Sequence, residues 1–314
     1  MRILITGGAG FIGSHLSQFH HQKNDEVWVI DNLITGSQKN ISSLVKSKNF
    51  HFIKADLISF DFQTLLSFDI IYHLASPASP IQYKKYPLET LLVNSIGTYR
   101  LLEFTKKSNS KVAVIASTSE IYGDPSVHPQ VEGYWGNVNP VGVRSCYDEG
   151  KRFSEAVAMS FVRKHKLNVR IARIFNTYGP NMEKNDGRVV SNFIIQALEN
   201  KPLTIYGHGQ QTRSFCYVSD LISGLYSLAT TKNIDGQVVN LGSPNEKQII
   251  ELAKIIIQLT KSKSKISYQP IDEDDPQRRQ PDISKAKKLL NWKPEVQLED
   301  GLKKTIKYFQ ERFL

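Results

Sequence analysis

The chain of 314 residues is 40% hydrophobic and 22% charged, which is enough for one large domain or two modest ones with a full core. It contains no window of 18 apolar residues that would predict a membrane span, and it opens with an apolar strand and glycines rather than a signal peptide. Its two cysteines, Cys146 and Cys216, exclude a disulfide framework and a cysteine-rich metal site, and they predict a reducing, cytoplasmic location.

The net charge of +10 predicts attraction to an anion, such as a nucleotide sugar or a nucleic acid, unless it reflects only a lysine-rich solvated surface. The lysines are scattered and form no block interleaved with aromatic residues, which favours the solvated surface. The pair His20 and His21 predicts no metal site, because adjacent residues do not share a helix face and no third ligand is evident. We therefore expect neither nucleic acid nor a metal.

The N-terminal residues have the pattern of a dinucleotide-binding unit. A short apolar strand leads into Gly7, Gly10 and Gly13, and a helical pattern follows. A second predicted strand, 26–30, ends in Asp31, eighteen residues beyond Gly13. The glycines let the backbone approach a pyrophosphate at the helix N-terminus, and a carboxylate at this distance suits the adenosine ribose hydroxyls. Because the carboxylate would repel a 2′-phosphate, the pattern favours NAD over NADP.

Strand and helix signals alternate through the first two thirds of the chain, which predicts a doubly wound parallel sheet with helices on both faces. After Gly179 and Pro180 the pattern loosens into a smaller α/β region over the carboxyl ends of the strands. We expect one domain at 1–180 plus about 214–242 and a second at about 181–213 and 243–314. The expected strands are 2–6, 26–30, 50–54, 69–74, 112–117, 169–174 and 237–241, with shorter ones at 203–206 and near 265–269. The expected helices are 88–107, 148–165, 189–199, 246–261, 283–290 and 298–312, and a charged loop is expected at 272–282.

Tyr147 and Lys151 stand four residues apart, on one face of a predicted helix. An ammonium near the phenol would lower the tyrosine pKa from about 10 towards working pH, so that Tyr147 could take a proton from a substrate hydroxyl. The strand at 112–117 ends in polar residues, which in such a sheet point into the ligand crevice. We expect Thr118 to hydrogen-bond the reacting oxygen, Tyr147 to move its proton, and Lys151 to bind the nicotinamide ribose and tune Tyr147.

These motifs, with several longer segments, resemble the extended branch of the short-chain dehydrogenase/reductase superfamily, and most of all the UDP-glucuronate decarboxylases. The resemblance covers essentially the whole chain. It implies a Rossmann-type NAD-binding domain, a smaller α/β substrate domain, and a homodimer in which the helices at 88–107 and 148–165 form a four-helix interface. The glycine-rich and Tyr-x-x-x-Lys motifs identify only the superfamily. The segments 75–80 and 186–193 are typical of a much smaller group of families within it. The segments that carry the resemblance are 73–80, 117–125, 147–152, 173–180, 185–193 and 211–215.

The resemblance also implies roles for individual residues. Glu120 would act near C5 of the sugar as an acid, a base or a water-positioning group, and Arg279 would be an active-site arginine, unless it pairs with the acidic run at 272–275. The implied cofactor residues are Gly7, Gly10, Phe11, Ile12, Gly13, Asp31, Asn32, Thr35, Gly36, Asp56, Leu57, Leu74, Ala75, Tyr147 and Lys151. The implied substrate residues are Ser119, Asn176, Arg188, Tyr206, Arg213 and Arg279.

The serine at position 119 helps to distinguish between the reactions that the resemblance implies. In the related nucleotide-sugar 4,6-dehydratases an aspartate at this position protonates the leaving C6 hydroxyl, whereas serine is a poor proton donor. A carboxylate here would repel the carboxylate of an acidic sugar, but a serine can hydrogen-bond it. The residue therefore argues against dehydration and fits UDP-glucuronate.

The implied reaction begins when Tyr147 takes the proton of the C4 hydroxyl while C4 passes a hydride to NAD. The β-keto acid then loses CO2, C5 is reprotonated, and C4 is reduced again to give UDP-xylose. One alternative is a 4-epimerase or 4,6-dehydratase of the same fold, and another is a decarboxylase that releases UDP-4-keto-pentose and NADH. A third, of a different class, is a non-catalytic superfamily member that binds RNA, which the intact glycine, Thr118, Tyr147 and Lys151 motifs disfavour.

Overall fold

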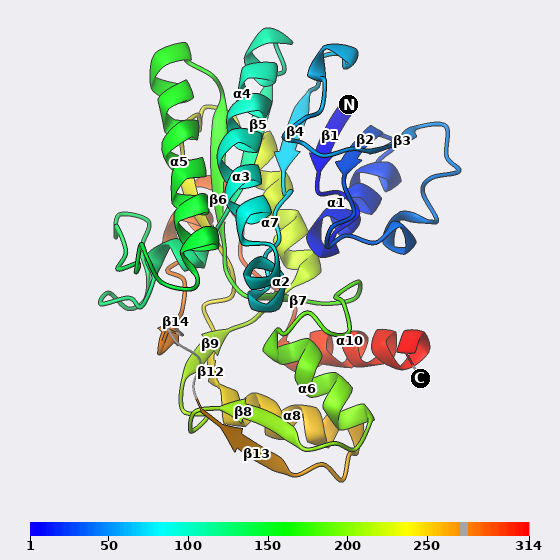
Figure 1. Cartoon of the computed structure of the whole chain (residues 1–314), viewed down its shortest axis with the longest axis vertical. Coiled ribbons are helices and arrows are strands. Elements are labelled where there is room, and N and C mark those ends of the chain that lie inside the picture. Colours follow the sequence, from blue (N-terminus) through cyan, green and yellow to red (C-terminus); the bar gives the residue numbers. More distant parts are fainter. Residues whose placement is uncertain (271–275, 314) are drawn as a thin grey trace.

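The computed structural model describes residues 1–270 and 276–313, and its centre is one parallel sheet of seven strands (Figure 1). The strands are β1 (Arg2–Thr6), β2 (Glu26–Asp31), β3 (Phe50–Lys54), β4 (Ile70–His73), β5 (Val112–Thr118), β6 (Val169–Ile174) and β11 (Val238–Leu241). They lie in the order β11-β6-β5-β4-β1-β2-β3, so the chain reverses its direction of travel across the sheet between β1 and β4. The predicted doubly wound sheet is confirmed, and all seven strands had been expected at these positions.

Alternate residues of each central strand belong to two different cores, because successive side chains point to opposite faces of a sheet. On β1, Ile3 and Ile5 pack in the core that contains Leu16 of α1 (Phe11–Gln22) and residues of α7 (Val218–Thr230). Leu4 belongs to the opposite core, with Leu101 of α4 (Thr98–Lys107) and residues of α5 (Ser145–His165). Both faces are covered, so the strands are continuously apolar rather than alternating.

Two expected helices differ from the structure for local reasons. The helix expected at 88–107 is divided into α3 (Pro87–Leu92), a π-helical turn η3 (Val93–Gly97) and α4. The helix expected at 246–261 starts only at α8 (Ile249–Thr260), because a capping box between Gln248 and Glu251 fixes its first turn. The residues before it form β12 (Glu246–Gln248).

A smaller group of elements lies beyond the carboxyl ends of the sheet strands (Figure 1). In it, α6 (Val189–Leu198), α8 and α10 (Leu298–Phe313) contact one another. The strand pairs are β8 (Leu203–Tyr206) with β13 (Ile266–Gln269) and β7 (Thr177–Tyr178) with β10 (Cys216–Tyr217), while β9 (Thr212–Ser214) lies between β12 and β14 (Arg278–Arg279). The remaining elements are α2 (Pro80–Lys85), α9 (Ser284–Leu290) and the 3-10 turns η1 (Gln38–Ile41), η2 (Phe62–Thr64) and η4 (Ser119–Tyr122).

Two details of this region bear on the predictions. The loop expected at 272–282 is wrong at Arg278 and Arg279, which form β14 beside β9. Helix α9, which the sequence assigned to the second domain, contacts β11 and α7 of the sheet region. The division into two domains therefore stays a prediction. Among the described residues, no helix is long and apolar enough to cross a membrane, and both cysteines are free.

Candidate active site

A cavity of about 510 Å³ opens at the carboxyl ends of the sheet strands, around the point between β1 and β4 where the chain order reverses. Open parallel sheets bind their ligands at such a point. The lining contains every predicted cofactor residue, and every predicted catalytic and substrate residue except Arg279. The fold thus brings together groups that lie far apart in the sequence.

The glycine loop between β1 and α1 forms a cradle that no larger residue could form. Gly7 has a φ of +76°, and a Cβ on Gly13 would lie 2.1 Å from the carbonyl oxygen of Gly7. Gly10 is the N-cap of α1 and provides no side-chain cap, so the first turn of the helix offers its backbone N–H groups to a ligand. Such a helix N-terminus binds anionic groups such as a pyrophosphate.

Asp31, at the end of β2, is held beside this cradle by the backbone. Its Oδ2 accepts a hydrogen bond from Ala9 N at 3.0 Å, and its Oδ1 accepts one from Leu33 N at 2.8 Å. Burial raises the pKa of this carboxyl, although the two backbone donors act in the opposite direction. Each carboxylate oxygen keeps a further lone pair, so Asp31 can still accept a hydrogen bond from a ribose hydroxyl.

Tyr147 and Lys151 lie one turn apart on α5, with Lys151 Nζ 5.9 Å from the centre of the Tyr147 ring. Lys151 Nζ donates to Ala116 O on β5 at 2.7 Å, and burial lowers its pKa to about 7. Burial also raises the pKa of Tyr147 to about 12, opposed by a hydrogen bond with Thr118. The expected lowering of the Tyr147 pKa is therefore wrong for this structure, because burial outweighs every favourable charge around the phenol.

Tyr83 of α2 is a site residue that the sequence did not reveal. Its ring stacks on that of Tyr147, with centroids 5.1 Å apart and planes 7° apart. Tyr83 lines the cavity, is 1% exposed, and its hydroxyl has no hydrogen-bond partner in the structure. The signal in the sequence was its place three residues after the end of the 75–80 segment.

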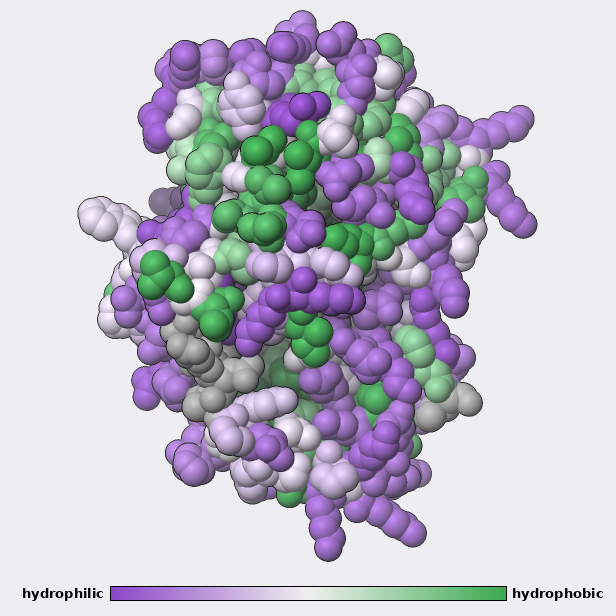
Figure 2. All heavy atoms as spheres, in the orientation of Figure 1, coloured by the Kyte–Doolittle hydropathy of each residue, from purple (hydrophilic) through white to green (hydrophobic). Residues whose placement is uncertain are grey.

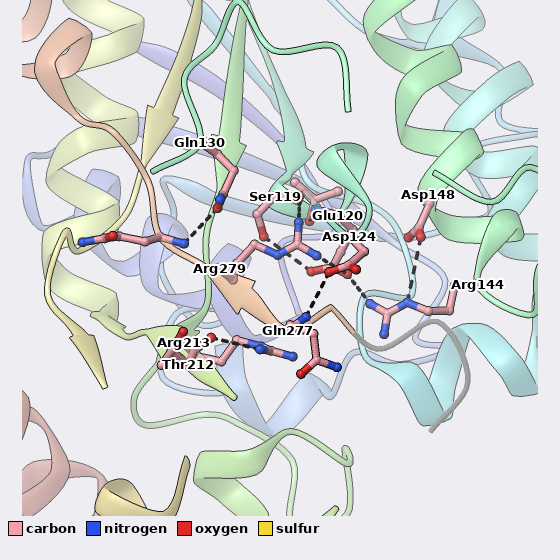
Figure 3. A network of polar contacts seen from close by, with 12 residues as sticks. Ser119, Glu120, Asp124, Gln130, Arg144, Asp148, Thr212, Arg213, Gln277 and Arg279 are labelled. Atoms are coloured by element: carbon pink, nitrogen blue, oxygen red, sulfur yellow. Dashed lines mark hydrogen bonds and ion pairs between the residues drawn. The ribbon is translucent and has the colours of Figure 1, made fainter. Parts of the chain in front are cut away.

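Glu120 is the centre of a buried charge network at the end of β5 (Figure 3). Its Oε2 accepts hydrogen bonds from Arg144 Nη2 and, at 3.3 Å, from Arg279 Nη2. Arg279 also donates from Nη1 to Ser119 O, and it is 1% exposed. Arg279 therefore does not line the cavity itself. It contacts Ser119 and Glu120, which do line it. The acidic run proposed as its alternative partner lies outside the described residues.

The charges in this network set unequal pKa values for its two carboxyls. Burial would raise the pKa of Glu120, but Arg279, Arg144 and Arg213 together lower it to about 2. Burial and the negative charge of Glu120 raise the pKa of Asp148 to about 8, although Arg144 acts in the opposite direction. At neutral pH Glu120 is therefore ionised and Asp148 is mostly protonated. Arg144 was missed in the sequence, where only its place three residues before Tyr147 could have indicated it.

The predicted nucleotide residues also line the cavity. Arg188, directly before α6, lies 3.7 Å from Asp186 and 5.8 Å from the centre of the Phe11 ring in the glycine loop. Arg213 of β9 donates to Thr212 O at 2.9 Å, and Tyr206 at the end of β8 is 47% exposed. Asn176 lines the same cavity. Two arginines that line one cavity can neutralise a diphosphate.

The two adjacent histidines contact other side chains within the fold. His20 is buried and contacts Asp25 at 2.7 Å and the Tyr72 hydroxyl at 3.2 Å. His21 contacts Ser47 at 2.8 Å. In the part of the chain that the structure describes, no three His, Cys, Asp or Glu side chains could together hold a metal ion. The cavity thus combines a glycine cradle suited to a pyrophosphate with cationic side chains and with the ionisable groups of Tyr147, Lys151 and Glu120.

Comparisons with known proteins agree with this geometry. The family model described as GDP-mannose 4,6-dehydratase matches residues 4–305. UDP-glucuronic acid decarboxylase 1 of Danio rerio is 52% identical over 98% of this chain, which spans 72% of that protein. UDP-glucuronic acid 4-epimerase from Bacillus cereus, solved with UDP-glucuronic acid and NAD, is 31% identical with a TM-score of 0.91 over the full length of both chains. The dTDP-glucose 4,6-dehydratase DesIV of Streptomyces venezuelae, solved with NAD, is 27% identical with a TM-score of 0.90, over 99% of this chain and 98% of that one.

Proposed function

The chain belongs to the GDP-mannose 4,6-dehydratase family within the extended short-chain dehydrogenase/reductase superfamily, and from this we propose that it is a UDP-glucuronate decarboxylase. It converts UDP-glucuronate to UDP-xylose and CO2. The observation that carries the proposal is the convergence of Tyr147, Thr118 and the Glu120–Arg279 pair on one cavity that also holds the glycine cradle. The serine at position 119 supports an acidic sugar, because a carboxylate there would repel it.

The cradle at Gly7 and Gly13, the uncapped N-terminus of α1 and the carboxylate of Asp31 support NAD as the cofactor. A side chain on either glycine would fill the space that the pyrophosphate needs. Bound NAD would supply the redox chemistry by accepting a hydride from C4 of the sugar and returning it at the end. Lys151, with a pKa lowered by burial to about 7, would hydrogen-bond the nicotinamide ribose.

The remaining steps of the proposed reaction are each assigned to residues of the chain. Tyr147 takes the proton of the C4 hydroxyl and returns it when C4 is reduced again, while Thr118, which hydrogen-bonds Tyr147, holds the same oxygen. Burial raises the pKa of Tyr147, and the positive charge of bound NAD would act in the opposite direction. Once C4 is a ketone, the electrons of the C5–carboxylate bond move into it and CO2 leaves. A proton must then be added at C5. Because Glu120 is ionised, we assign it the role of positioning the water molecule that delivers this proton from solvent. Arg188 and Arg213 neutralise the diphosphate.

The decisive assay follows CO2 and nucleotide sugars together after UDP-glucuronate is added to the purified protein, with and without NAD. We expect CO2 and UDP-xylose in equal amounts, identified by NMR, and no net rise in absorbance at 340 nm. Absence of both CO2 and xylose would contradict the proposal. A steady rise at 340 nm with a 4-keto-pentose product would instead indicate early release of the reduced cofactor.

A UDP-glucuronate 4-epimerase is the second candidate, because the solved epimerase with that ligand superimposes over the whole chain. It would use the same first step but retain the carboxylate, so its product is a hexuronate and no CO2 is formed. A 4,6-dehydratase is less compatible, because Ser119 provides no acid for the C6 hydroxyl. The NMR assay above separates all three reactions.

A homodimer is also proposed. Leu88, Leu92, Ile96 and Tyr99 form an exposed apolar stripe along α3, η3 and α4, and Phe153 of α5 lies 49% exposed. Figure 2 shows apolar atoms gathered over these helices on the face in view. Light scattering should give about twice the chain mass of 35.6 kDa, and Ile96→Glu should give the monomer. A cytoplasmic location and the absence of nucleic acid stay predictions from the sequence.

A further inference from the structure

Glu120 has two arginine partners, and they come from different parts of the fold (Figure 3). Arg279 belongs to β14, which pairs with β9 beyond the carboxyl ends of the sheet. Arg144 directly precedes α5, and its carbonyl accepts the N–H groups of Tyr147 and Asp148, both at 3.0 Å. Arg144 is thus anchored to the first turn of the helix that carries the proposed base, whereas Arg279 is anchored among the substrate-side strands.

We propose that Arg144 is a positioning residue that keeps Glu120 ionised and oriented at the cavity, an inference that rests on the proposed function. The two side chains form an ion pair in which Arg144 is 11% exposed and Glu120 is 17% exposed. In such a poorly solvated place a carboxylate that lost this partner would rotate away or bind a proton at higher pH. The role proposed for Glu120 near C5 then depends on a residue at the start of the helix that carries Tyr147.

Arg144 contacts a second carboxyl besides that of Glu120. Its Nε lies 3.9 Å from Asp148 Oδ2, and burial together with the negative charge of Glu120 raises the pKa of that carboxyl, which favours the ion pair with Glu120. The Ser119 hydroxyl donates to the other oxygen of Glu120 at 3.4 Å, which is a weak contact. Among the described residues, the charged and titratable groups that act on Glu120 include Arg144, Tyr147 and Asp148 around α5, Arg279 on β14, Arg213 on β9 and Tyr83 on α2.

The test compares Arg144→Met, Arg144→Lys and Glu120→Gln in the full-length protein loaded with NAD, using CO2 release from UDP-glucuronate. We expect Arg144→Met to lower kcat about 30-fold while KM changes by less than about threefold, because the residue acts on Glu120 and not on the substrate. The acid limb of its pH profile should move up by about 1–2 pH units, since Glu120 loses a cation. Arg144→Lys, which retains the charge, should recover much of both changes.

A double-mutant cycle separates an effect through Glu120 from a direct one. If Arg144 acts through Glu120, adding Arg144→Met to Glu120→Gln should change kcat by less than about twofold. A full further loss in the double variant, or a loss confined to KM, would overturn the proposal and identify Arg144 as a substrate-binding group. The exposed Arg163 of the same helix provides the control Arg163→Met, which should leave all parameters unchanged.

The same double-mutant cycle can be measured through melting temperatures, which do not depend on catalytic activity. Arg144→Met should lower the midpoint of the otherwise unmodified protein by about 5 °C, but lower that of Glu120→Gln much less. Equal losses in both backgrounds would contradict the pairing. If the unmodified protein releases no CO2, the decarboxylase proposal fails, while this cycle still tests whether Arg144 holds Glu120.

Discussion

The two halves of the cavity are built in different ways. The centre of the proposed cofactor half comes from one short stretch, residues 7–31, in which the backbone N–H of Ala9 in the glycine loop donates to the carboxylate of Asp31. The sugar half comes from separate segments, and Glu120 and Arg279, which touch, are 159 residues apart in sequence. A site made from neighbouring residues can be recognised as a motif, whereas one made from distant residues exists only after folding.

The halves also differ in what they present to a ligand. The cofactor half offers backbone N–H groups and space, so its substitutions act through steric exclusion. The sugar half offers buried charges, so its substitutions act through ionisation and orientation. Each of the following changes is directed at one half and should leave the other half intact.

Tyr147→Phe should have the largest effect, a loss of about a thousandfold in kcat, because it removes the group that moves the C4 proton. Binding of NAD and of UDP-glucuronate, measured by calorimetry, should change little, since the ring can still stack on Tyr83. Tyr268→Phe, at a position 54% exposed, is the matched control and should behave as the unmodified protein. Retention of more than about a tenth of the activity in Tyr147→Phe would remove Tyr147 as the base.

Gly13→Ala tests the cofactor half. Its Cβ would lie 2.1 Å from Gly7 O, so the loop must shift, and we expect NAD affinity to fall at least about a hundredfold, the equivalent of about 2.7 kcal/mol. Uridine diphosphate should still bind, because it contacts the other half. Gly133→Ala, where an added Cβ meets nothing within 4 Å, is the control. Unchanged NAD binding in Gly13→Ala would show that the cradle is not the pyrophosphate site.

Ser119→Asp tests whether the sugar half tolerates a further negative charge at position 119. A second carboxylate beside Glu120 and near the sugar carboxylate should lower kcat/KM for UDP-glucuronate about 30-fold through like-charge repulsion. Ser119→Ala removes the hydroxyl without adding a charge, so its loss should be only about threefold. If the two variants lose equal activity, the serine matters for its hydrogen bond and not for the absence of charge.

Asp148→Asn should have the smallest effect, visible as a change in how stability depends on pH. The folded-state pKa of Asp148 is raised to about 8, so between about pH 4 and 8 the folded protein binds more protons at this carboxyl than the unfolded chain. Stability due to this group therefore falls as pH rises through that window. At pH 8 the variant should be more stable by at least about 1.4 kcal/mol in urea unfolding, with no difference near pH 4. Asp300→Asn, at an exposed position, is the control. If the stability of Asp148→Asn and that of the unmodified protein depend on pH in the same way, the raised pKa of Asp148 is contradicted.

Much of the fold could be predicted because its signals are local. Each of the seven sheet strands is an apolar run bounded by turn residues, and both faces of the sheet are buried. The exceptions follow from interactions that short windows do not contain. Strand β14 exists because Arg278 and Arg279 pair with β9, which lies more than sixty residues earlier. The helix expected from 246 begins only at Ile249 because residues 246–248 form β12, which pairs with the distant strand β9.

By itself, the sequence determined the cofactor half, the position of Tyr147 beside Lys151, and the serine at 119, since these depend on residue identity and on spacings of a few residues. Only the tertiary structure decided that Tyr83 stacks on Tyr147, that Arg279 acts from behind Glu120, and that Arg144 is its second partner. It also reversed the expected pKa of Tyr147. The physical reason is that burial and long-range charge pairs arise from packing, and packing joins residues whose separation in sequence carries no periodic signal.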